Sequence, residues 1–166
     1  MTIHIVNPKT TYIHIPKTGG QSIKNWIRCL KLPIEQGFEH GTLRSAQQKW
    51  NDLGTTFTLV RNPYDRMVSI YFYAQARIKA GHNFLSQQTY DTIQKDKEEL
   101  CKESFEKGFD WWIHFMYDYA DELYINEVFP FFVATRPQVS WFSKQDIDLV
   151  IKLENIKTDI QQLKNM

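Results

Sequence analysis

Apolar positions near the start of the chain predict a strand, a turn and then a helix. The run from Thr11 to Ile15 is rich in β-branched and aromatic side chains and stops at Pro16, which is typical of a short buried strand. Gly19 and Gly20 follow as a turn signal. After them, apolar residues recur every three or four positions and predict an amphipathic helix: Ile23, Trp26, Ile27 and Leu30.

The same order of elements repeats further along the chain. Thr56 to Val60 is typical of a second strand. Asn62 is suited to cap a helix, Pro63 to occupy its first position, and Asp65 to face the positive end of the helix dipole. Apolar residues then continue at helical spacing, at Met67, Ile70, Tyr71 and Ala74. Two strand–loop–helix units predict an α/β fold.

The second half has a less regular pattern. Residues 89–107 are polar and charged, which is typical of a solvated helix or an exposed excursion. Residues 131–134 and 149–153 are possible late strands, and the tail from Asn155 predicts a short polar helix. Between these segments, aromatic residues recur at helical spacing and are interpreted as core packing, an acceptor-binding wall being the alternative: Phe109, Trp112, Phe115 or Met116, and Tyr119.

Composition limits the kind of protein that this chain forms. Its 166 residues and an apolar content of 42% predict one globular domain over residues 1–166. No stretch approaches the roughly 18 apolar residues of a membrane span, and the first residues lack the pattern of a secretion signal. Cys29 and Cys101 are too few for a disulfide framework or a zinc site. We therefore expect a cytoplasmic protein with reduced thiols and no membrane partner, a single disulfide being the alternative.

Charge is unevenly distributed along the chain. Residues 1–85 carry 11 basic and 4 acidic side chains, whereas residues 86–166 carry 9 basic and 15 acidic ones. The first half is therefore expected to face an anion, unless the two halves simply neutralise each other. The basic residues are scattered, with no Lys/Arg-rich tract, and so favour a small polyanion over a nucleic acid.

The turn after the first strand has the composition of an anion-binding loop. Residues 16–22 read Pro-Lys-Thr-Gly-Gly-Gln-Ser. Glycines at this point allow consecutive N–H groups to point inward, and the start of the following helix adds partial positive charge. Lys17 supplies an ammonium group, and Thr18 and Ser22 supply hydroxyl donors. Because the lysine precedes the glycines, the spacing does not fit the magnesium–nucleotide loop G-x-x-x-x-G-K-[ST]. An ordinary strand-to-helix turn is the alternative.

Residues 15–22 resemble the 5′-phosphosulfate loop of sulfotransferases that use 3′-phosphoadenosine 5′-phosphosulfate (PAPS). The resemblance is greatest to the carbohydrate-type branch, whose loop commonly reads P-K-T-G-G-T-S; Gln21 departs from that pattern. It implies a P-loop-like, three-layer α/β domain with a short central parallel sheet flanked by helices. It also implies PAPS as donor and its desulfated form PAP as product. No metal is expected, because the sequence contains neither a metal-ligand cluster nor a magnesium motif.

A second element supports the resemblance. Residues 59–71 are similar to the family's 3′-phosphate element, R-[DN]-P-x-x-R-x-x-S-x-[YF]. Arg61, at the end of a strand, is suited to grip a phosphate through two N–H groups. Ser69 lies about two turns into the next helix and is expected to donate its hydroxyl to the same phosphate. Arg66 is predicted either to contact phosphate or to form a structural ion pair.

Weaker similarities follow, and with them the remaining roles. Residues 136–138 and 153–155 resemble later landmarks of the family, whose members normally continue well beyond the second, so the chain is expected to be short at its C-terminus. His40 lies between the two phosphate elements, where the family carries its base, and Glu39 is the alternative. The implied catalytic residues are Lys17 and His40, and the implied nucleotide-binding residues are Lys17, Thr18, Gly19, Gly20, Gln21, Ser22, Arg61 and Ser69.

Three functions remain open at this point. The first is sulfuryl transfer from PAPS to an acceptor hydroxyl, with a saccharide favoured over a protein tyrosine as the acceptor. The second is a non-catalytic module that binds PAP or PAPS, and the third is a P-loop kinase-like phosphotransferase. Four tryptophans are candidate sugar-stacking platforms, although each is individually more typical of a core: Trp50, Trp111, Trp112 and Trp141.

Overall fold

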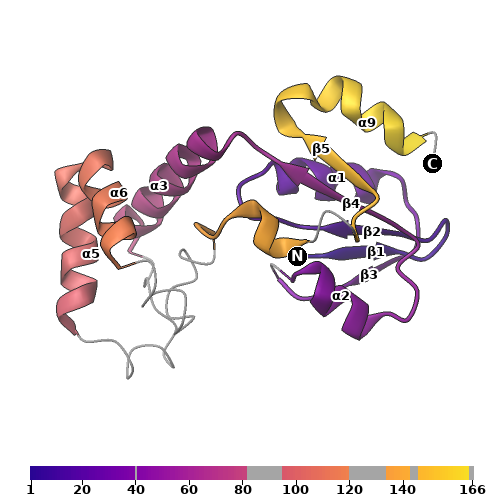
Figure 1. Ribbon diagram of the computed structural model, residues 1–166, viewed down its shortest axis with the longest axis horizontal. Helices are drawn as coiled ribbons and strands as arrows, with labels where there is room; N and C mark the ends of the chain where they lie inside the picture. Colours follow the sequence, from indigo (N-terminus) through magenta and orange to yellow (C-terminus); the bar gives the residue numbers. More distant parts are fainter. Residues whose placement is uncertain (40, 82–94, 120–133, 143–145, 165–166) are drawn as a thin grey trace. The chain divides into compact units, whose positions relative to one another are not determined.

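The computed structural model describes residues 1–39, 41–81, 95–119, 134–142 and 146–164 (Figure 1). The chain divides into two compact units. The sheet unit comprises Met1–Pro63 and Pro137–Met166, and the helical unit comprises Tyr64–Arg136. One folding domain can contain two such units, so the expectation of a single domain over residues 1–166 stays a prediction.

Five strands form one sheet in the sheet unit, in the order β3-β1-β2-β4-β5. Strands β2 and β4 pair in parallel, as do β4 and β5, whereas β1 is antiparallel to both of its neighbours. All strands except β1 therefore run in one direction. The predicted α/β fold is confirmed, with an antiparallel strand added to the parallel sheet. The strands are β1 (Ile3–Ile5), β2 (Thr10–Ile13), β3 (Ile34–Gln36), β4 (Thr55–Val60) and β5 (Leu149–Lys152).

The two faces of this sheet differ in chemistry because successive side chains of a strand point to opposite sides. Apolar residues of β1, β2, β4 and β5 share one face, where they pack with helices α1 (Gly20–Cys29) and α9 (Ile156–Lys164). His4, Thr11, Thr56 and Thr58 alternate with those apolar residues. Trp50, which ends helix α2 (Leu43–Lys49), stacks on His4 with ring centroids 5.1 Å apart. Helices thus cover both faces, as the predicted three-layer arrangement requires.

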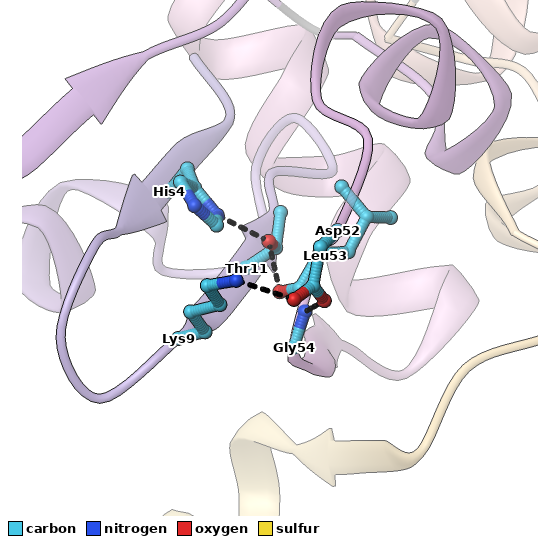
Figure 2. Close-up of polar contacts among 6 residues, drawn as sticks. All are labelled: His4, Lys9, Thr11, Asp52, Leu53 and Gly54. Carbon is cyan, nitrogen blue, oxygen red and sulfur yellow. Dashed lines mark hydrogen bonds and ion pairs between the residues drawn. The ribbon is translucent and has the colours of Figure 1, made fainter.

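A polar brace joins β1, β2 and the segment before β4 (Figure 2). The hydroxyl of Thr11 donates to the carbonyl of Leu53 over 2.6 Å and lies 2.9 Å from Nδ1 of His4. A hydroxyl has one proton, so Thr11 accepts from His4, and Nδ1 carries the hydrogen. His4 is a buried residue of β1, a strand too short to be evident from periodicity.

The helical unit has an aromatic core formed by α3 (Pro63–Lys79), α5 (Lys95–Lys107) and α6 (Phe109–Asp118). Tyr71 lies at its centre and contacts the rings of Phe105, Phe109 and Trp112, with centroids 5.3, 5.3 and 5.5 Å away. The interpretation of the aromatic stripe as core is confirmed by the burial of Trp112, Phe115 and Met116.

The charged region before this stripe is helical over α5. That helix is not solvated on all sides, because Cys101, Ser104 and Phe105 are buried. Cys29 on α1 is exposed, and neither cysteine forms a disulfide. The possible strand at 131–134 lies almost entirely outside the described residues. Within the described ranges, no helix combines the length and apolar character that crossing a bilayer demands.

Candidate functional site

The loop between β2 and α1 has a backbone conformation and a close packing that favour glycine. Lys17 and Gly19 adopt positive φ angles of 65° and 86°. Gly20 packs directly against the ring of His14, so that an added Cβ would lie only 1.9 Å from its Nε2. The glycines therefore do more than form a flexible turn: one permits a left-handed conformation, and the other permits close contact between α1 and the end of β2.

The first turn of α1 contains backbone N–H groups for which the helix itself supplies no acceptor. Gly19 occupies the N-cap position, and no side chain caps the helix there. Its carbonyl accepts hydrogen bonds from the N–H groups of Ser22 (3.0 Å) and Ile23 (3.3 Å). The preceding N–H groups, of Gly20 and Gln21, lie in the first turn, where an α-helix supplies no acceptor. This helix start is accordingly suited to bind an anion.

The polar side chains of the loop have separate partners. Thr18 is fully buried and donates its hydroxyl proton to the carbonyl of Ile15 over 2.9 Å. Its side chain was predicted to donate to the anion; in this structure the hydroxyl instead stabilises the turn. Gln21 is exposed and donates to Asn25 over 3.1 Å, while Ser22 is exposed at the first turn of α1.

The second predicted element lies at the same edge of the sheet. Because β2 and β4 are parallel, with Ile13 opposite Thr58, both strands end at one edge. Lys17 follows the first strand and Arg61 follows the second. Partial burial lowers the pKa of the Lys17 ammonium, and the nearby charge of Arg61 lowers it further. The positive charges of Lys17 and Arg61 therefore lie close enough to repel each other.

Both later sequence landmarks lie against the Arg61 segment. The side-chain amide of Gln138 exchanges two hydrogen bonds with the backbone of Arg61, at 2.9 Å to its N–H and 2.7 Å to its carbonyl. Glu154 accepts from the N–H of Asn62 over 2.6 Å. This hydrogen bond, the backbone N–H of Glu154 itself and the charge of Arg61 lower the pKa of the carboxyl group. Sequence similarity marked both segments but assigned no contact to either residue.

The turn η2 (Leu153–Asn155) lies at the same edge of the sheet, after the end of a third strand. It directly follows β5, which pairs with β4 up to Val60 and Lys152. The side chain of Leu153 lies against Gly19, where an added Cβ would come within 2.9 Å of its Cδ1. Three strand ends therefore meet around the loop, Arg61 and Glu154.

Comparison with known families agrees with this arrangement. The sequence model of the Sulfotransferase family matches residues 5–166, nearly the whole chain. The chain belongs to the sulfotransferase family. Sulfotransferases transfer a sulfuryl group from a nucleotide donor to an acceptor, and this is the general activity that the family assigns here. No curated protein and no solved structure matches the chain.

Two more residues of the sulfotransferase motif lie on α3, in the helical unit. Ser69 is half-buried there, and its contact with a 3′-phosphate stays a prediction. Arg66 is only 3% exposed and donates to the carbonyls of Ala134 and, over 3.0 Å, Arg136. Of the two roles predicted for Arg66, the structural one is therefore favoured, with backbone carbonyls among its partners.

The predicted base of the sulfotransferase, His40, lies outside the described residues. Its neighbours are held by Thr2, which donates its N–H to the carbonyl of Phe38 (3.1 Å) and its hydroxyl to that of Gly41 (3.1 Å). Glu39, the alternative base, is exposed. The segment that carries both candidate bases is thus attached to the sheet on either side.

Three of the four tryptophans suggested as sugar platforms belong to the core. Trp50, Trp112 and Trp141 are at most 8% exposed, whereas Trp111 is 58% exposed, with the ammonium of Lys107 over its ring. A different aromatic residue, Phe38, is 62% exposed and lies two positions before His40. Among the described residues, no cluster of three or more potential ligands for a metal ion occurs.

Proposed function

We propose that this protein transfers a sulfuryl group from PAPS to a hydroxyl group of a saccharide. The observation that carries the proposal is the placement of Lys17 and Arg61 at one sheet edge, where the charge of Arg61 lowers the pKa of Lys17. Like charges held together oppose each other until an anion lies between them. A nucleotide that bears phosphate groups on both its 5′ and 3′ positions supplies negative charge for both residues.

The loop after β2 is assigned to the 5′ end of this nucleotide. The backbone of Gly19, the N–H groups of Gly20 and Gln21, and the hydroxyl of Ser22 bind the phosphosulfate. Lys17 stabilises the negative charge that develops on the leaving phosphate oxygen. In an in-line displacement, the acceptor oxygen forms a bond to sulfur while the bond from sulfur to that leaving oxygen breaks.

Arg61 is assigned to the 3′ end. A guanidinium donates two parallel N–H groups to one phosphate, a geometry that a lysine does not provide. Ser69 is proposed, from the motif alone, to donate its hydroxyl to the same phosphate. Together these contacts distinguish PAPS from nucleotides that lack a 3′-phosphate.

His40 is proposed as the base that removes the proton from the acceptor hydroxyl. A histidine that titrates near neutral pH is suited to this step, which typically contributes about 10²–10⁴-fold to a rate. Phe38 lies two positions before His40, and its backbone carbonyl is held by the N–H of Thr2. Its exposed ring is suited to pack on the apolar face of a sugar. This ring supports a saccharide as acceptor.

The test is transfer of labelled sulfate from PAPS to a panel of glycans. We expect a labelled glycan, and we expect His40→Ala to abolish transfer while the affinity for PAP is retained. Glu39→Gln is the matched control and is expected to keep activity. A chelator is expected to leave the rate unchanged, since the loop lacks the magnesium-binding GK[ST] spacing.

Other outcomes would contradict the proposed function or the proposed role of His40. Binding of PAP without transfer to any acceptor would indicate a non-catalytic nucleotide-binding module. A preference for ATP with magnesium over PAPS would indicate a phosphotransferase. Normal turnover of His40→Ala would remove His40 from the mechanism.

A further inference from the structure

Gln138 forms an unusual contact with the backbone of Arg61. Its side-chain oxygen accepts from the Arg61 N–H over 2.9 Å, and its side-chain nitrogen donates to the Arg61 carbonyl over 2.7 Å. One side chain therefore satisfies both polar backbone groups of a single residue, in the way that a neighbouring strand would. Arg61 lies just beyond the last residue of β4, where pairing with β5 ends at Val60 and Lys152.

Gln138 is itself part of a fixed turn. It is the first residue of the short helical turn η1 (Gln138–Trp141). In this turn Ser140 donates both its N–H (2.9 Å) and its hydroxyl (2.7 Å) to the carbonyl of Pro137. Trp141, at the end of the turn, is 2% exposed and anchors it in the core. Gln138 is half-buried, so the two hydrogen bonds are partly shielded from water.

We propose that Gln138 is a positioning residue that holds the backbone of Arg61, and thereby aims its guanidinium at the 3′-phosphate of the donor. The proposal rests on the proposed function, because it takes the ligand of Arg61 to be that phosphate. The direction of an arginine side chain depends first on the φ and ψ angles of its own residue. A primary amide suits this task because it supplies one donor and one acceptor.

A substitution that keeps the size of Gln138 and removes both hydrogen bonds tests this role. For Gln138→Met we expect the affinity for PAP to fall about tenfold or more, the size of effect that two lost hydrogen bonds produce. Binding of adenosine 5′-phosphosulfate, which lacks the 3′-phosphate, is expected to change about twofold at most, within the effect of a peripheral contact. Isothermal titration calorimetry of both nucleotides measures the difference. Val139→Ala, on an exposed residue of the same turn, is the matched control and is expected to bind both nucleotides normally.

A double-mutant cycle separates positioning from general support of the fold. In a protein that already carries Arg61→Ala, Gln138→Met is expected to cause no further loss of PAP affinity, because its effect passes through the missing guanidinium. Hydrogen exchange at the Arg61 amide is expected to be faster in Gln138→Met and normal in Val139→Ala.

Specific outcomes would overturn the proposal. Equal losses for both nucleotides, or an undiminished effect of Gln138→Met beside Arg61→Ala, would show that Gln138 supports the fold and does not position Arg61. If the unaltered protein binds no PAP at all, the proposed function fails as a whole. Unchanged exchange at the Arg61 amide contradicts the positioning role independently of any nucleotide.

Discussion

Lys17 is the residue whose electrostatic environment is most informative. Partial burial and the charge of Arg61 both lower its pKa. The uncharged form is therefore more populated at alkaline pH than in an ordinary lysine, and a bound anion has the opposite effect because it favours the protonated form.

The affinity for PAP is therefore expected to decrease as the pH rises through the lowered pKa of Lys17, with a proton taken up on binding in that range. Isothermal titration calorimetry across neutral and alkaline pH, in buffers of different ionisation enthalpy, measures both effects. Lys17→Arg is the control, since an arginine stays charged throughout and removes this part of the pH dependence. The same decrease in both proteins would contradict the assignment of Lys17.

Gly20 illustrates how tightly the loop packs. An alanine there places its Cβ within 1.9 Å of Nε2 of His14, a clash with a buried ring. We expect Gly20→Ala to reduce the free energy of unfolding by about 1–3 kcal/mol, the cost of overpacking, and to weaken PAP binding. Denaturant unfolding measures the first effect.

A second substitution isolates the cause of the Gly20 effect. His14→Ala removes the obstructing ring, so adding Gly20→Ala to it is expected to cost less than in the unaltered protein. An equal cost of Gly20→Ala with and without His14 would show that the ring is not the reason.

The sequence was most informative about single elements whose residues are close together in the chain. The strand before the phosphate loop and the helix after it follow from a local apolar pattern, and the structure confirms both as β2 and α1. Contacts between distant segments could not be read in this way. Gln138 and Arg61 are 77 positions apart, and no local pattern indicates that they meet. The hydroxyl of Thr18 is a different case, because it donates to a backbone carbonyl only three positions earlier and residue type alone does not reveal that choice of acceptor.

The brace between β1, β2 and β4 makes a testable contribution to stability (Figure 2). Thr11→Val removes the hydroxyl that bridges His4 and the carbonyl of Leu53, and so takes a hydrogen-bond partner from a buried ring and from a partly buried carbonyl. We expect the free energy of unfolding to fall by about 1–3 kcal/mol. Lys9→Met, which breaks only the exposed ion pair with Asp52, is the control and is expected to change it little. Equal effects of the two substitutions in denaturant unfolding would contradict the role of Thr11.

At the scale of the whole molecule, the two units differ in charge as well as in structure. The sheet unit contains 12 basic and 7 acidic residues, and the helical unit contains 8 basic and 12 acidic ones. The excess of basic over acidic residues in the first half of the sequence therefore lies mainly in the unit that carries the phosphate loop and Arg61. This distribution agrees with an anionic nucleotide as the ligand of the sheet unit.

Arg66 tests whether the second arginine of the motif serves the helical unit or the nucleotide. Its guanidinium donates to the carbonyls of Ala134 and Arg136 from a buried position. Arg66→Met is therefore expected to reduce the free energy of unfolding by about 2 kcal/mol or more, while the preference for PAP over adenosine 5′-phosphosulfate is retained. Lys79→Met, on an exposed residue of the same helix, is the control. Loss of that preference in a protein of normal stability would assign Arg66 to the phosphate.

The central claim is that one nucleotide is held at both ends, by the loop that follows Lys17 and by Arg61. Calorimetric titration of the folded protein with PAP and with adenosine 5′-phosphosulfate tests it most directly. We predict one PAP bound per chain, and for Arg61→Ala a loss of at least about tenfold in PAP affinity, the effect of removing charged hydrogen bonds, with little change for the nucleotide that lacks the 3′-phosphate. Failure to bind PAP, or equal losses for both nucleotides in Arg61→Ala, would contradict the account.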